Sequence, residues 1–427
     1  MRRGIAATAL VAALALAATA CGGDTQDGKD AAGETKAGGE LSGTVTWWDT
    51  SNDAEKASFQ KIAEAFTAKH PKVTVKYVNV PYGDAQNKVK NAFSSGSDAP
   101  DVIRADVGWV ADFASLGYLD EVPAETAKKV DAEFLPQAAA SGKYEGKTYA
   151  VPQVIDTLGL FYNKKMLADA GVQPPTTLEE LKTAAAAIKA KTGKAGLYLR
   201  GDDSYWFLPL IYGEGGDLVD AKNKTVTVDN AAGVKAFKTA RELVTSGAAV
   251  TNATDGWTNM QTAFKSGEAA MMINGPWAVA DTYAGDQFKD KANLGVAAVP
   301  AGSVKAGAPQ GGHDLGVYAG SKNRAAAHAF VDYMTSQEVQ VQSAKDLSLL
   351  PTRTAAYEAP DVKSSEMVQF FKPAVDKAVE RAWIPENGSL FEPLKVEYTK
   401  AITGASSPED AAKAAGAEFR KILKGWK

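Results

Sequence analysis

The chain has 427 residues, of which 45% are hydrophobic and 23% are charged, and its formal net charge is −4. This length is ample for two lobes that each bury a core of their own. The mild acidity argues against nucleic acid and against an anionic membrane surface as the main partner. Because there is one cysteine and there are three histidines, an intrachain disulfide is excluded and a zinc site is not expected.

The N-terminus has the pattern of a secretory signal, with two arginines, an apolar run over 5–20 and small residues before Cys21. A cysteine at this place resembles the lipobox of bacterial lipoproteins, in which it is acylated after cleavage. Ala18 departs from that pattern, which usually has leucine there. We expect residues 1–20 to be a lipoprotein signal peptide and Cys21 to anchor the chain to the outer face of the cell membrane. An ordinary secretory signal is the alternative, and it also places the rest of the chain outside the cytoplasm.

The segment that follows, residues 21–40, has no large apolar side chain. It cannot bury enough surface to offset the entropy lost on ordering, so we expect a disordered tether after the acylated cysteine. The folded body is expected over 41–427. No segment within it is apolar enough to cross a bilayer.

The first part of the folded body alternates between strand and helix patterns. The predicted elements are a strand over 44–48, a helix over 55–69, a strand over 73–80, a helix over 83–93 and a strand over 100–103. Such alternation predicts a largely parallel sheet with helices on both faces. Sheets of this kind bind ligands beyond the carboxyl ends of their strands, which directs attention to the loops at 49–53 and 104–109.

The remainder of the chain continues to mix the two patterns. The predicted elements are strands over 158–163, 197–199, 269–273 and 315–319, and helices over 178–191, 205–212, 231–246, 259–265 and 325–335. The helix over 178–191 has an N-terminal capping threonine and two glutamates in its first turn, which suit the positive end of a helix dipole.

Several motifs occur along residues 41–427, namely WWD, PDVI, LGLFYNKKML, PTTLEEL, AFKSGEAAMMINGPW, LGVYAGSKN and LLPTR. Together they resemble the extracellular solute-binding proteins of bacterial ABC importers, and most of all the carbohydrate branch that includes the maltose-binding proteins. The likeness rests on the combination, since each motif alone is weak.

The resemblance implies an α/β fold of the two-lobed periplasmic-binding-protein type, with a hinge and a ligand cleft between the lobes. It implies one lobe over 41–154 and 315–353, and a second lobe over 155–314 and 354–427. It also implies a binding protein and not an enzyme, without a cofactor, that delivers a sugar to the permease subunits of an ABC transporter. We expect a monomer.

Sugars stack their C–H faces on aromatic rings and give hydrogen bonds to carboxylates, amides and arginines. Aromatic and acidic residues are neighbours in several predicted loops. From this pattern we predict ligand contacts by Asp106 and Trp109 in the first lobe and by Trp257 in the second. A purely structural role at a helix start is an equal alternative for Asp106 and Trp109.

Trp277 is the strongest single candidate. Gly275 and Pro276 form a stiff turn at a predicted helix start, which can fix the indole ring at the wall of a cleft. The NGPW motif also matches the motif that holds a stacking tryptophan in maltose-binding proteins. The alternative is a core tryptophan packed under the turn.

Other candidates come mainly from the resemblance, although Asp203 and Tyr205 are also aromatic and acidic neighbours in a predicted loop. Asp203 and Tyr205 align with an acid and a ring that hold sugar, and Asp156 aligns with an acid of the crossover segment. Helix capping by Asp203 and a solvated hinge carboxylate at Asp156 are the alternatives. Asn52 and Asp53 stand where maltose-binding proteins have an acid–lysine pair.

At the C-terminal end, Trp383 or Phe391 could replace the stacking aromatic that the family has elsewhere, and a core role is open for both. Residues 311–313 could approach the ligand by their backbone, and a plain turn is the alternative that we favour. These departures leave the exact sugar open. The class that we expect is a malto-oligosaccharide or a related α-linked disaccharide such as trehalose.

Two other functions stay open. One is the binding of a different solute, such as a peptide, a metal or a polyamine, which also uses aromatic and acidic side chains. The other is a secreted glycoside hydrolase, which needs two carboxylates at a fixed separation. The chain contains no GxSxG, HExxH or P-loop motif, which argues against those enzyme classes.

Overall fold

The computed structural model describes residues 40–427. The predicted signal peptide, Cys21 and nearly all of the predicted tether therefore lie outside the described residues. Within the part that is described, no helix combines the length and the apolar character that crossing a membrane would require.

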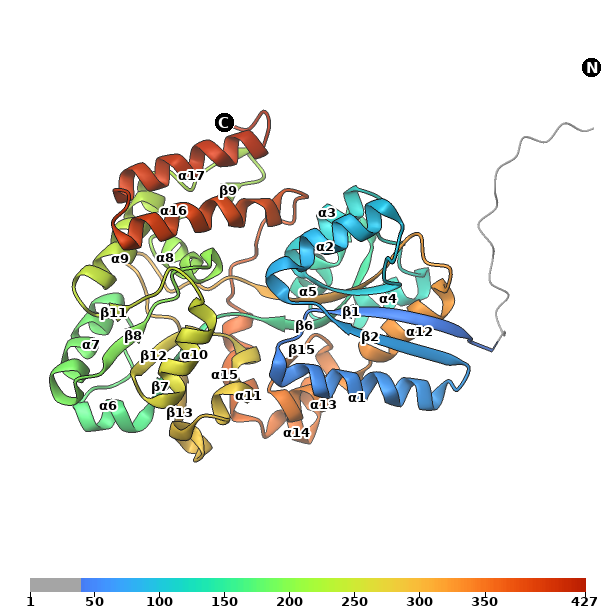
Figure 1. Ribbon diagram of the computed structural model, residues 1–427, viewed down its shortest axis with the longest axis horizontal. Helices are drawn as coiled ribbons and strands as arrows, with labels where there is room; N and C mark the ends of the chain where they lie inside the picture. Colours follow the sequence, from blue (N-terminus) through green and yellow to red (C-terminus); the bar gives the residue numbers. More distant parts are fainter. Residues whose placement is uncertain (1–39) are drawn as a thin grey trace, which may run out of the picture. The chain divides into compact units, whose positions relative to one another are not determined.

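Two β-sheets organise residues 40–427, and each defines one lobe (Figure 1). The first lobe contains the sheet β15-β6-β14-β3-β1-β2, and the second contains the sheet β11-β8-β12-β7-β13. The first sheet comprises β1 (Gly43–Asp49), β2 (Val73–Asn79), β3 (Val102–Asp106), β6 (Ala150–Asp156), β14 (Gly311–Val317) and β15 (Leu350–Pro351). The second comprises β7 (Gly159–Asn163), β8 (Ala195–Tyr198), β11 (Ala249–Val250), β12 (Ala269–Asn274) and β13 (Leu294–Ala297). Short hairpins are formed by β4 (Lys143–Tyr144) with β5 (Lys147–Thr148) and by β9 (Val219–Asp220) with β10 (Thr225–Val226).

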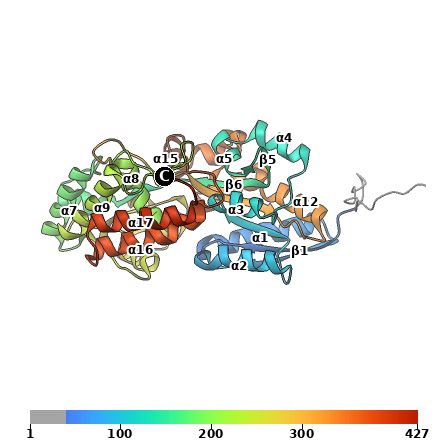
Figure 2. The same ribbon diagram turned by 90° about the horizontal axis from the view of Figure 1, so that it is seen from above.

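Helices flank both sheets, as the view from above also shows (Figure 2). Around the first sheet lie α1 (Asp53–Lys69), α2 (Tyr82–Ser95), α3 (Val110–Ser115), α4 (Ala124–Glu133), α5 (Pro136–Ser141), α12 (Arg324–Met334) and α13 (Gln337–Leu347). The others are α6 (Lys164–Ala170), α7 (Leu178–Thr192), α8 (Leu208–Gly213), α9 (Ala231–Thr245), α10 (Gly256–Ser266), α11 (Val279–Tyr283), α14 (Pro360–Lys363), α15 (Glu366–Val375), α16 (Phe391–Thr403) and α17 (Pro408–Ile422). Three short 3₁₀ turns matter for the site, namely η1 (Val107–Trp109), η2 (Ser204–Phe207) and η3 (Pro276–Ala278), and a fourth, η7 (Asn387–Leu390), precedes α16.

The prediction of a largely parallel sheet is wrong for the first lobe as a whole. β2 and β3 are parallel to β1, as the alternation over 44–103 predicts. However, β14 is antiparallel to both β3 and β6, and β15 is antiparallel to β6. The reversal follows from the path of the chain, because β6 leads directly to β7 in the other sheet and β14 enters this sheet from the second lobe.

The prediction that helices cover both faces of the first sheet is confirmed. Successive side chains of a strand point to opposite faces. Accordingly, Trp47 of β1 is buried in a core with Phe59 and Phe66 of α1, whereas Trp48 packs against the other core, which includes Phe93 of α2. The second lobe is built around one large core, to which α7, α9, α15, α16 and α17 contribute and which extends to Ile155 of β6 and Leu350 of β15 in the first lobe. The two-lobed fold is therefore the one expected, although its exact lobe boundaries stay a prediction.

Two predicted elements differ from the structure. The helix predicted from Tyr205 begins instead as the 3₁₀ turn η2, and the α-helix α8 starts only at Leu208. The turn predicted at 311–313 is the start of strand β14, whose Gly311 pairs with Asp156 of β6. In this strand Gly312 has a φ of 138°, a value that side chains rarely allow, so the glycine signal marks an irregular strand and not a loop.

Candidate functional site

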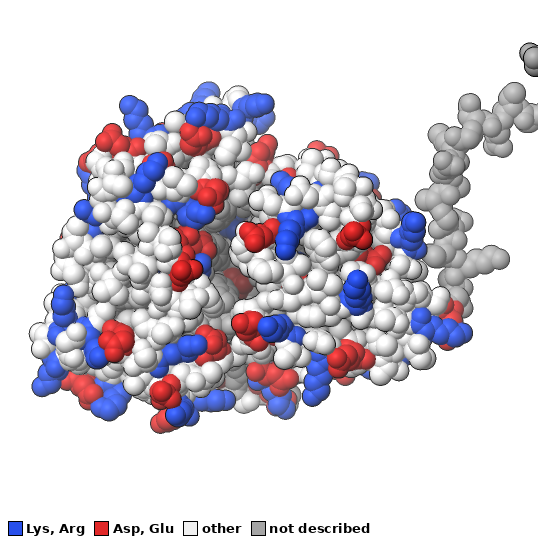
Figure 3. All heavy atoms as spheres, in the orientation of Figure 1, with Lys and Arg blue, Asp and Glu red and all other residues white. Residues whose placement is uncertain are grey.

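Three strands of the first sheet end on an aspartate at the edge that faces the second lobe. Asp49 ends β1, Asp106 ends β3 and Asp156 ends β6, and the pairing shows that these strands run in the same direction. The space-filling view shows a hollow between the lobes with acidic side chains at its rim (Figure 3). Ligands of α/β sheets bind beyond the carboxyl ends of strands, so this edge is the place to look for a site.

An ion pair between Asp106 and Arg381 joins this edge of the first sheet to the segment between α15 and η7. Arg381 lies between α15 and η7, and its Nη2 donates to Asp106 Oδ1 at 2.9 Å. Both residues are buried. The aspartate also accepts hydrogen bonds from the backbone of Gly108 at 2.7 Å and from the hydroxyl of Tyr82 at 3.0 Å. The predicted site residue Asp106 therefore lies here, and it also serves the helix-start role that was its alternative.

Asp156 and Tyr205 converge on Gly311. A Cβ atom at Gly311 would collide with Asp156 Oδ1 and with Tyr205 Oη, so only glycine allows these side chains to meet there. Burial, together with the negative charge of Asp106, raises the pKa of Asp156 to about 7. Asp156 is therefore a buried acid that can carry a proton near neutrality and not the solvated carboxylate that was its alternative.

Five buried polar atoms in this region have no hydrogen-bonding partner among the described residues. They are Tyr205 Oη, His313 Nδ1 and Nε2, Arg381 Nε and Asn387 Oδ1. Burial lowers the pKa of His313 well below its usual value, so the ring is neutral and offers one donor and one acceptor. Because buried polar groups nearly always have partners, this concentration of unpaired donors and acceptors fits a ligand rich in hydroxyl groups.

The second lobe contributes a cluster of aromatic rings, here called the aromatic wall and consisting of Tyr205, Trp206, Trp257 and Trp277. Neighbouring ring centroids are 5.8–6.4 Å apart, and several pairs are edge-to-face. Trp206 is fixed by a hydrogen bond of 2.7 Å from its indole nitrogen to the carbonyl of Ile273. Trp277 is half-buried and packs against the cores of both lobes. The sequence-predicted Tyr205, Trp257 and Trp277 are therefore brought together.

The ring of Trp277 is held close to its own turn. A Cβ atom at Gly275 would collide with the indole, so the glycine of the NGPW motif lets the ring fold back over the backbone. Pro276 then starts η3 at a position that suits proline. The predicted mechanism for fixing this ring, a stiff turn at a helix start, is thus present.

Asp203 is engaged within its own lobe. One oxygen accepts a hydrogen bond of 2.9 Å from the backbone of Tyr205, which caps η2, and the other lies 3.3 Å from the guanidinium of Arg200. Arg200 in turn lies over the ring of Trp206, 4.1 Å from its centroid. Asp203 therefore has the capping role that was its alternative, and it helps to hold the base of the aromatic wall.

The first lobe offers one exposed ring. Tyr82 has 46% of its surface exposed and stacks on the buried Trp109 with ring centroids 5.3 Å apart. It also lies edge-on to His313, at 6.0 Å. The predicted residue Trp109 thus belongs to the core under α2 and α3, and the ring that reaches the surface is that of Tyr82.

Of the remaining predicted residues, Asn52 and Trp383 contact members of this group and Asp53 does not. Asn52 caps α1 and donates to the carbonyl of Trp277 at 3.2 Å. The side chain of Asp53 is 93% exposed and pairs with Lys56, so the structure does not bring it to this group. Trp383 donates its indole N–H to Glu380 at 2.6 Å and lies 5.6 Å from the guanidinium of Arg381.

Sequence reasoning missed Tyr82, Arg381 and Asn387 of this site, and it considered His313 only for its backbone. None belongs to a motif, and each acquires its role only by contact with a distant part of the chain; Arg381 and Asp106 are 275 residues apart. The one available signal was the arginine itself, since sugar sites use arginines as well as acids. Over residues 40–427, no group of three or more His, Cys, Asp and Glu side chains is placed to hold a metal ion.

Comparisons with known proteins agree with this geometry. The chain is 28% identical to the diacetylchitobiose-binding protein DasA of Streptomyces coelicolor, over 99% of each chain. It is 28% identical to the maltotriose-binding protein of Pyrococcus abyssi, over 82% of this chain and 75% of the relative.

Among solved structures, the GacH receptor of Streptomyces glaucescens is 62% identical, covers 91% of this chain and all of its own, and superposes with a TM-score of 0.89. That receptor was solved without ligand and in complex with acarbose and an acarbose homolog. The model of the bacterial extracellular solute-binding proteins matches residues 50–341, which is most of the described chain. The chain is therefore a member of the bacterial extracellular solute-binding protein family.

Proposed function

We propose that this protein captures an oligosaccharide of α-linked glucose units, or a close analogue such as acarbose, and delivers it to the permease of an ABC importer. Family membership supports the transport role, and the GacH receptor and the maltotriose-binding protein support the ligand class. DasA is a diacetylchitobiose-binding protein, so this amino sugar is the strongest competing ligand among the relatives.

The observation that carries the proposal is that buried polar atoms without a hydrogen-bonding partner lie beside a cluster of aromatic rings. Tyr205, Arg381 and Asn387 each hold a buried polar atom without a partner. The aromatic wall lies next to them, since Tyr205 belongs to it and Arg381 lies 5.7 Å from the ring of Tyr205. A sugar ring needs this combination, because its C–H faces stack on aromatic rings while its hydroxyls give and accept hydrogen bonds.

The same geometry supports binding over hydrolysis. A retaining or inverting glycosidase needs one free carboxylate as nucleophile or base beside a protonated acid. Asp156 could be such an acid, but Asp106 already accepts from Arg381, Gly108 and Tyr82. With its oxygens occupied in this way, Asp106 is poorly placed to act as the second group, and the site is better suited to holding a sugar than to cleaving one.

The finer features of the proposal rest on the sequence. We place the protein outside the cytoplasm, tethered by an acylated Cys21 and residues 21–40 to the outer face of the membrane, and we expect it to work as a monomer. Labelling with a radioactive or alkyne-tagged fatty acid, with Cys21→Ser as the control, tests the anchor. Loss of the label in Cys21→Ser is the expected outcome, and an unchanged label would place the acyl chain elsewhere.

A thermal-shift panel tests the ligand class directly. The ligands are maltose, maltotriose, trehalose, acarbose, diacetylchitobiose and spermidine, each in about a thousandfold excess over a micromolar affinity. Such an excess stabilises the native state by about 4 kcal/mol, which raises the melting temperature by several degrees. We expect shifts with maltotriose or acarbose and none with spermidine.

The other outcomes separate the alternatives. A shift with diacetylchitobiose alone would keep the sugar-binding role and replace the α-glucoside. A shift with spermidine that disappears at high salt, and none with any sugar, would refute the sugar proposal. Release of free glucose from maltotriose during incubation would identify a hydrolase.

A further inference from the structure

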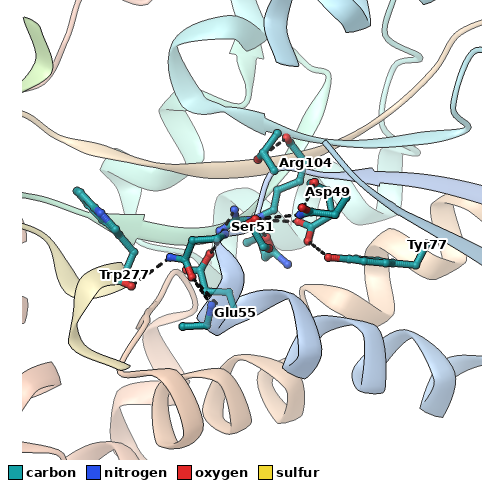
Figure 4. Close-up of polar contacts among 11 residues, drawn as sticks. Asp49, Ser51, Glu55, Tyr77, Arg104 and Trp277 are labelled. Atoms are coloured by element: carbon teal, nitrogen blue, oxygen red, sulfur yellow. Dashed lines mark hydrogen bonds and ion pairs between the residues drawn. The ribbon is translucent and has the colours of Figure 1, made fainter. Parts of the chain in front are cut away.

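A single side chain ties the start of α1 in the first lobe to the aromatic wall of the second. Asn52 precedes α1, and its Nδ2 donates to the backbone carbonyl of Trp277 at 3.2 Å. The two residues are 225 positions apart in the chain. Figure 4 shows Trp277 at one end of a series of polar contacts that runs back into the first lobe.

The direction of the Asn52 amide is fixed by its second role. Its Oδ1 accepts hydrogen bonds from the backbone of Ala54 at 2.9 Å and of Glu55 at 3.1 Å, which caps the helix. Oxygen and nitrogen of an amide side chain are assigned by their partners. Only one orientation gives an acceptor to these two N–H groups and a donor to the Trp277 carbonyl, so the cap aims the donor across the gap.

A buried charged network holds this cap in place. Glu55 Oε2 accepts from the backbone of Asn52 at 3.2 Å, completing a capping box, and lies 3.9 Å from the guanidinium of Arg104. Arg104 also lies 3.8 Å from Asp49 and donates to Gln153 at 2.8 Å. All of these side chains except that of Asn52 are buried in the first lobe. These buried contacts therefore fix the position of the Asn52 amide that donates to Trp277.

On the other side, the Trp277 ring is held by the second lobe, where it meets Tyr205 at 6.4 Å and Trp206 at 6.3 Å between centroids. Both lobes therefore hold this residue. Its ring meets Tyr205 and Trp206 in the second lobe and also packs against the core of the first, while its carbonyl accepts the bond from Asn52 of the first lobe. A hinge motion that separates the lobes must break the bond from Asn52, whereas the contacts of the ring with Tyr205 and Trp206 move with the second lobe.

We propose that Asn52 is a positioning residue that latches the lobes together through the carbonyl of Trp277 and does not itself bind the ligand. The proposal rests on the proposed function, because it assigns Trp277 to the sugar site. A bond that exists only when the lobes are together adds to the stability of the closed form, and so it slows release of a ligand that both lobes hold. A hydrogen bond between neutral groups corresponds to about threefold to tenfold in the release rate.

Asn52→Asp and Asn52→Ser separate the latch from the cap. Aspartate and serine cap helices as well as asparagine does, so we expect the melting temperature without ligand to stay close to that of the wild type. Aspartate replaces the donor by a carboxylate that faces a carbonyl oxygen, and serine is too short to reach it. We expect release of maltotriose or acarbose, followed by tryptophan fluorescence in a stopped-flow instrument, to be about tenfold faster for Asn52→Asp and about threefold faster for Asn52→Ser. Asp53→Asn, next in the chain and exposed, is the matched control and should release at the wild-type rate.

Small-angle scattering distinguishes a latch from a direct ligand contact. At saturating ligand, a variant that has lost only a sugar contact closes fully and has the wild-type radius of gyration. A variant that has lost the latch keeps a larger radius, because part of the population stays open. Wild-type release rates in both variants, or faster release with a wild-type radius at saturation, would overturn the proposal.

The scattering experiment also stands apart from the proposed function. If the wild type binds none of the sugars, the proposed function fails. The latch can then still be judged from the ligand-free proteins, in which Asn52→Asp should have a larger radius of gyration than both the wild type and Asp53→Asn. Equal radii in that comparison would refute the latch as well.

Discussion

The two lobes build their sides of the cleft from different materials. Behind the edge of the first lobe lies a network of buried charges, in which Arg104 sits between Asp49 and Glu55. The second lobe presents the aromatic wall, in which several rings meet edge to face and the nearest cation, Arg200, lies over Trp206. One side is held by electrostatics in a dry interior, and the other by the packing of rings.

The difference predicts two kinds of failure. A buried charge that loses its partner is strongly destabilising, so damage to the charged network should appear first as a loss of fold stability. Under the proposed function the partly exposed rings of the aromatic wall would offer surface to the ligand, so damage to the wall should appear first as a loss of affinity. Substitutions matched for size on the two sides can break or sharpen this contrast.

The largest effect is expected from Arg104→Met. The substitution keeps most of the side-chain volume but leaves the buried Asp49 and Glu55 without their cation, and burial already raises the pKa of both acids. We expect the free energy of unfolding in urea to fall by about 3–5 kcal/mol. Lys69→Ala removes an exposed cation 3.6 Å from Glu338 and should cost less than about 1 kcal/mol. Equal stability of Arg104→Met and the wild type would show that the network does not support the first lobe.

The next effect is expected from Trp277→Ala. We expect ligand affinity, measured by titration calorimetry, to fall by about a hundredfold, while the protein stays folded. Trp426→Ala is the matched control, since Trp426 is also half-buried against the core of the second lobe but lies at the C-terminal end of the chain. Unchanged affinity in Trp277→Ala would remove this ring from the site and the aromatic wall from the binding role.

The sequence predicted the residues on the second lobe's side of the cleft better than those on the first lobe's side. The NGPW turn fixes Trp277 by local sterics, so neighbouring residues were sufficient to predict a held ring. The helix α7 also starts at a local capping signal, at Thr177. In each of these cases the physical cause lies within a few residues along the chain.

The parts that sequence reasoning missed have causes that are distant along the chain. Arg381 matters because it meets Asp106, and Tyr82 because it covers Trp109. The antiparallel direction of β14 depends on where the chain returns from the other lobe. Asn52 was expected at the ligand because the resemblance placed it there, whereas its cap and its bond to Trp277 became visible only from the contacts. Contacts between residues so far apart in the chain leave no periodic pattern in the sequence from which they could be predicted.

The next effect is the pH dependence of stability that Asp156, at the end of β6 between the two lobes, should cause. The pKa of Asp156 is raised from 3.8 to about 7, first by burial and then by Asp106. Between these values the native state holds a proton that the unfolded chain has lost, so this group makes stability fall as pH rises through about 7. Asp156→Asn removes that dependence, and we expect its free energy of unfolding to exceed that of the wild type by up to about 4 kcal/mol near pH 8 and to equal it near pH 4.

The comparison isolates one group. Asp314, whose pKa burial raises to about 8, has the same sign of effect but is present in both proteins, so it cancels in the difference. Urea unfolding of the wild type and Asp156→Asn across this pH range is the measurement. A difference that grows toward low pH would mean that Asp156 is ionised and favourably paired in the native protein.

The smallest effect is expected from Trp383→Ala. The indole of Trp383 is bonded to Glu380 and lies 5.6 Å from the guanidinium of Arg381, close to the outer limit of a cation–π contact. Such a contact is worth about 0.5–1 kcal/mol, so we expect the alanine variant to bind ligand about threefold more weakly and Trp383→Phe to bind as the wild type does. The affinity would then depend on Trp383 only through the orientation of Arg381. A hundredfold loss instead would make Trp383 a stacking surface equal to Trp277, and the aromatic side of the cleft would have to extend into the segment that carries Arg381.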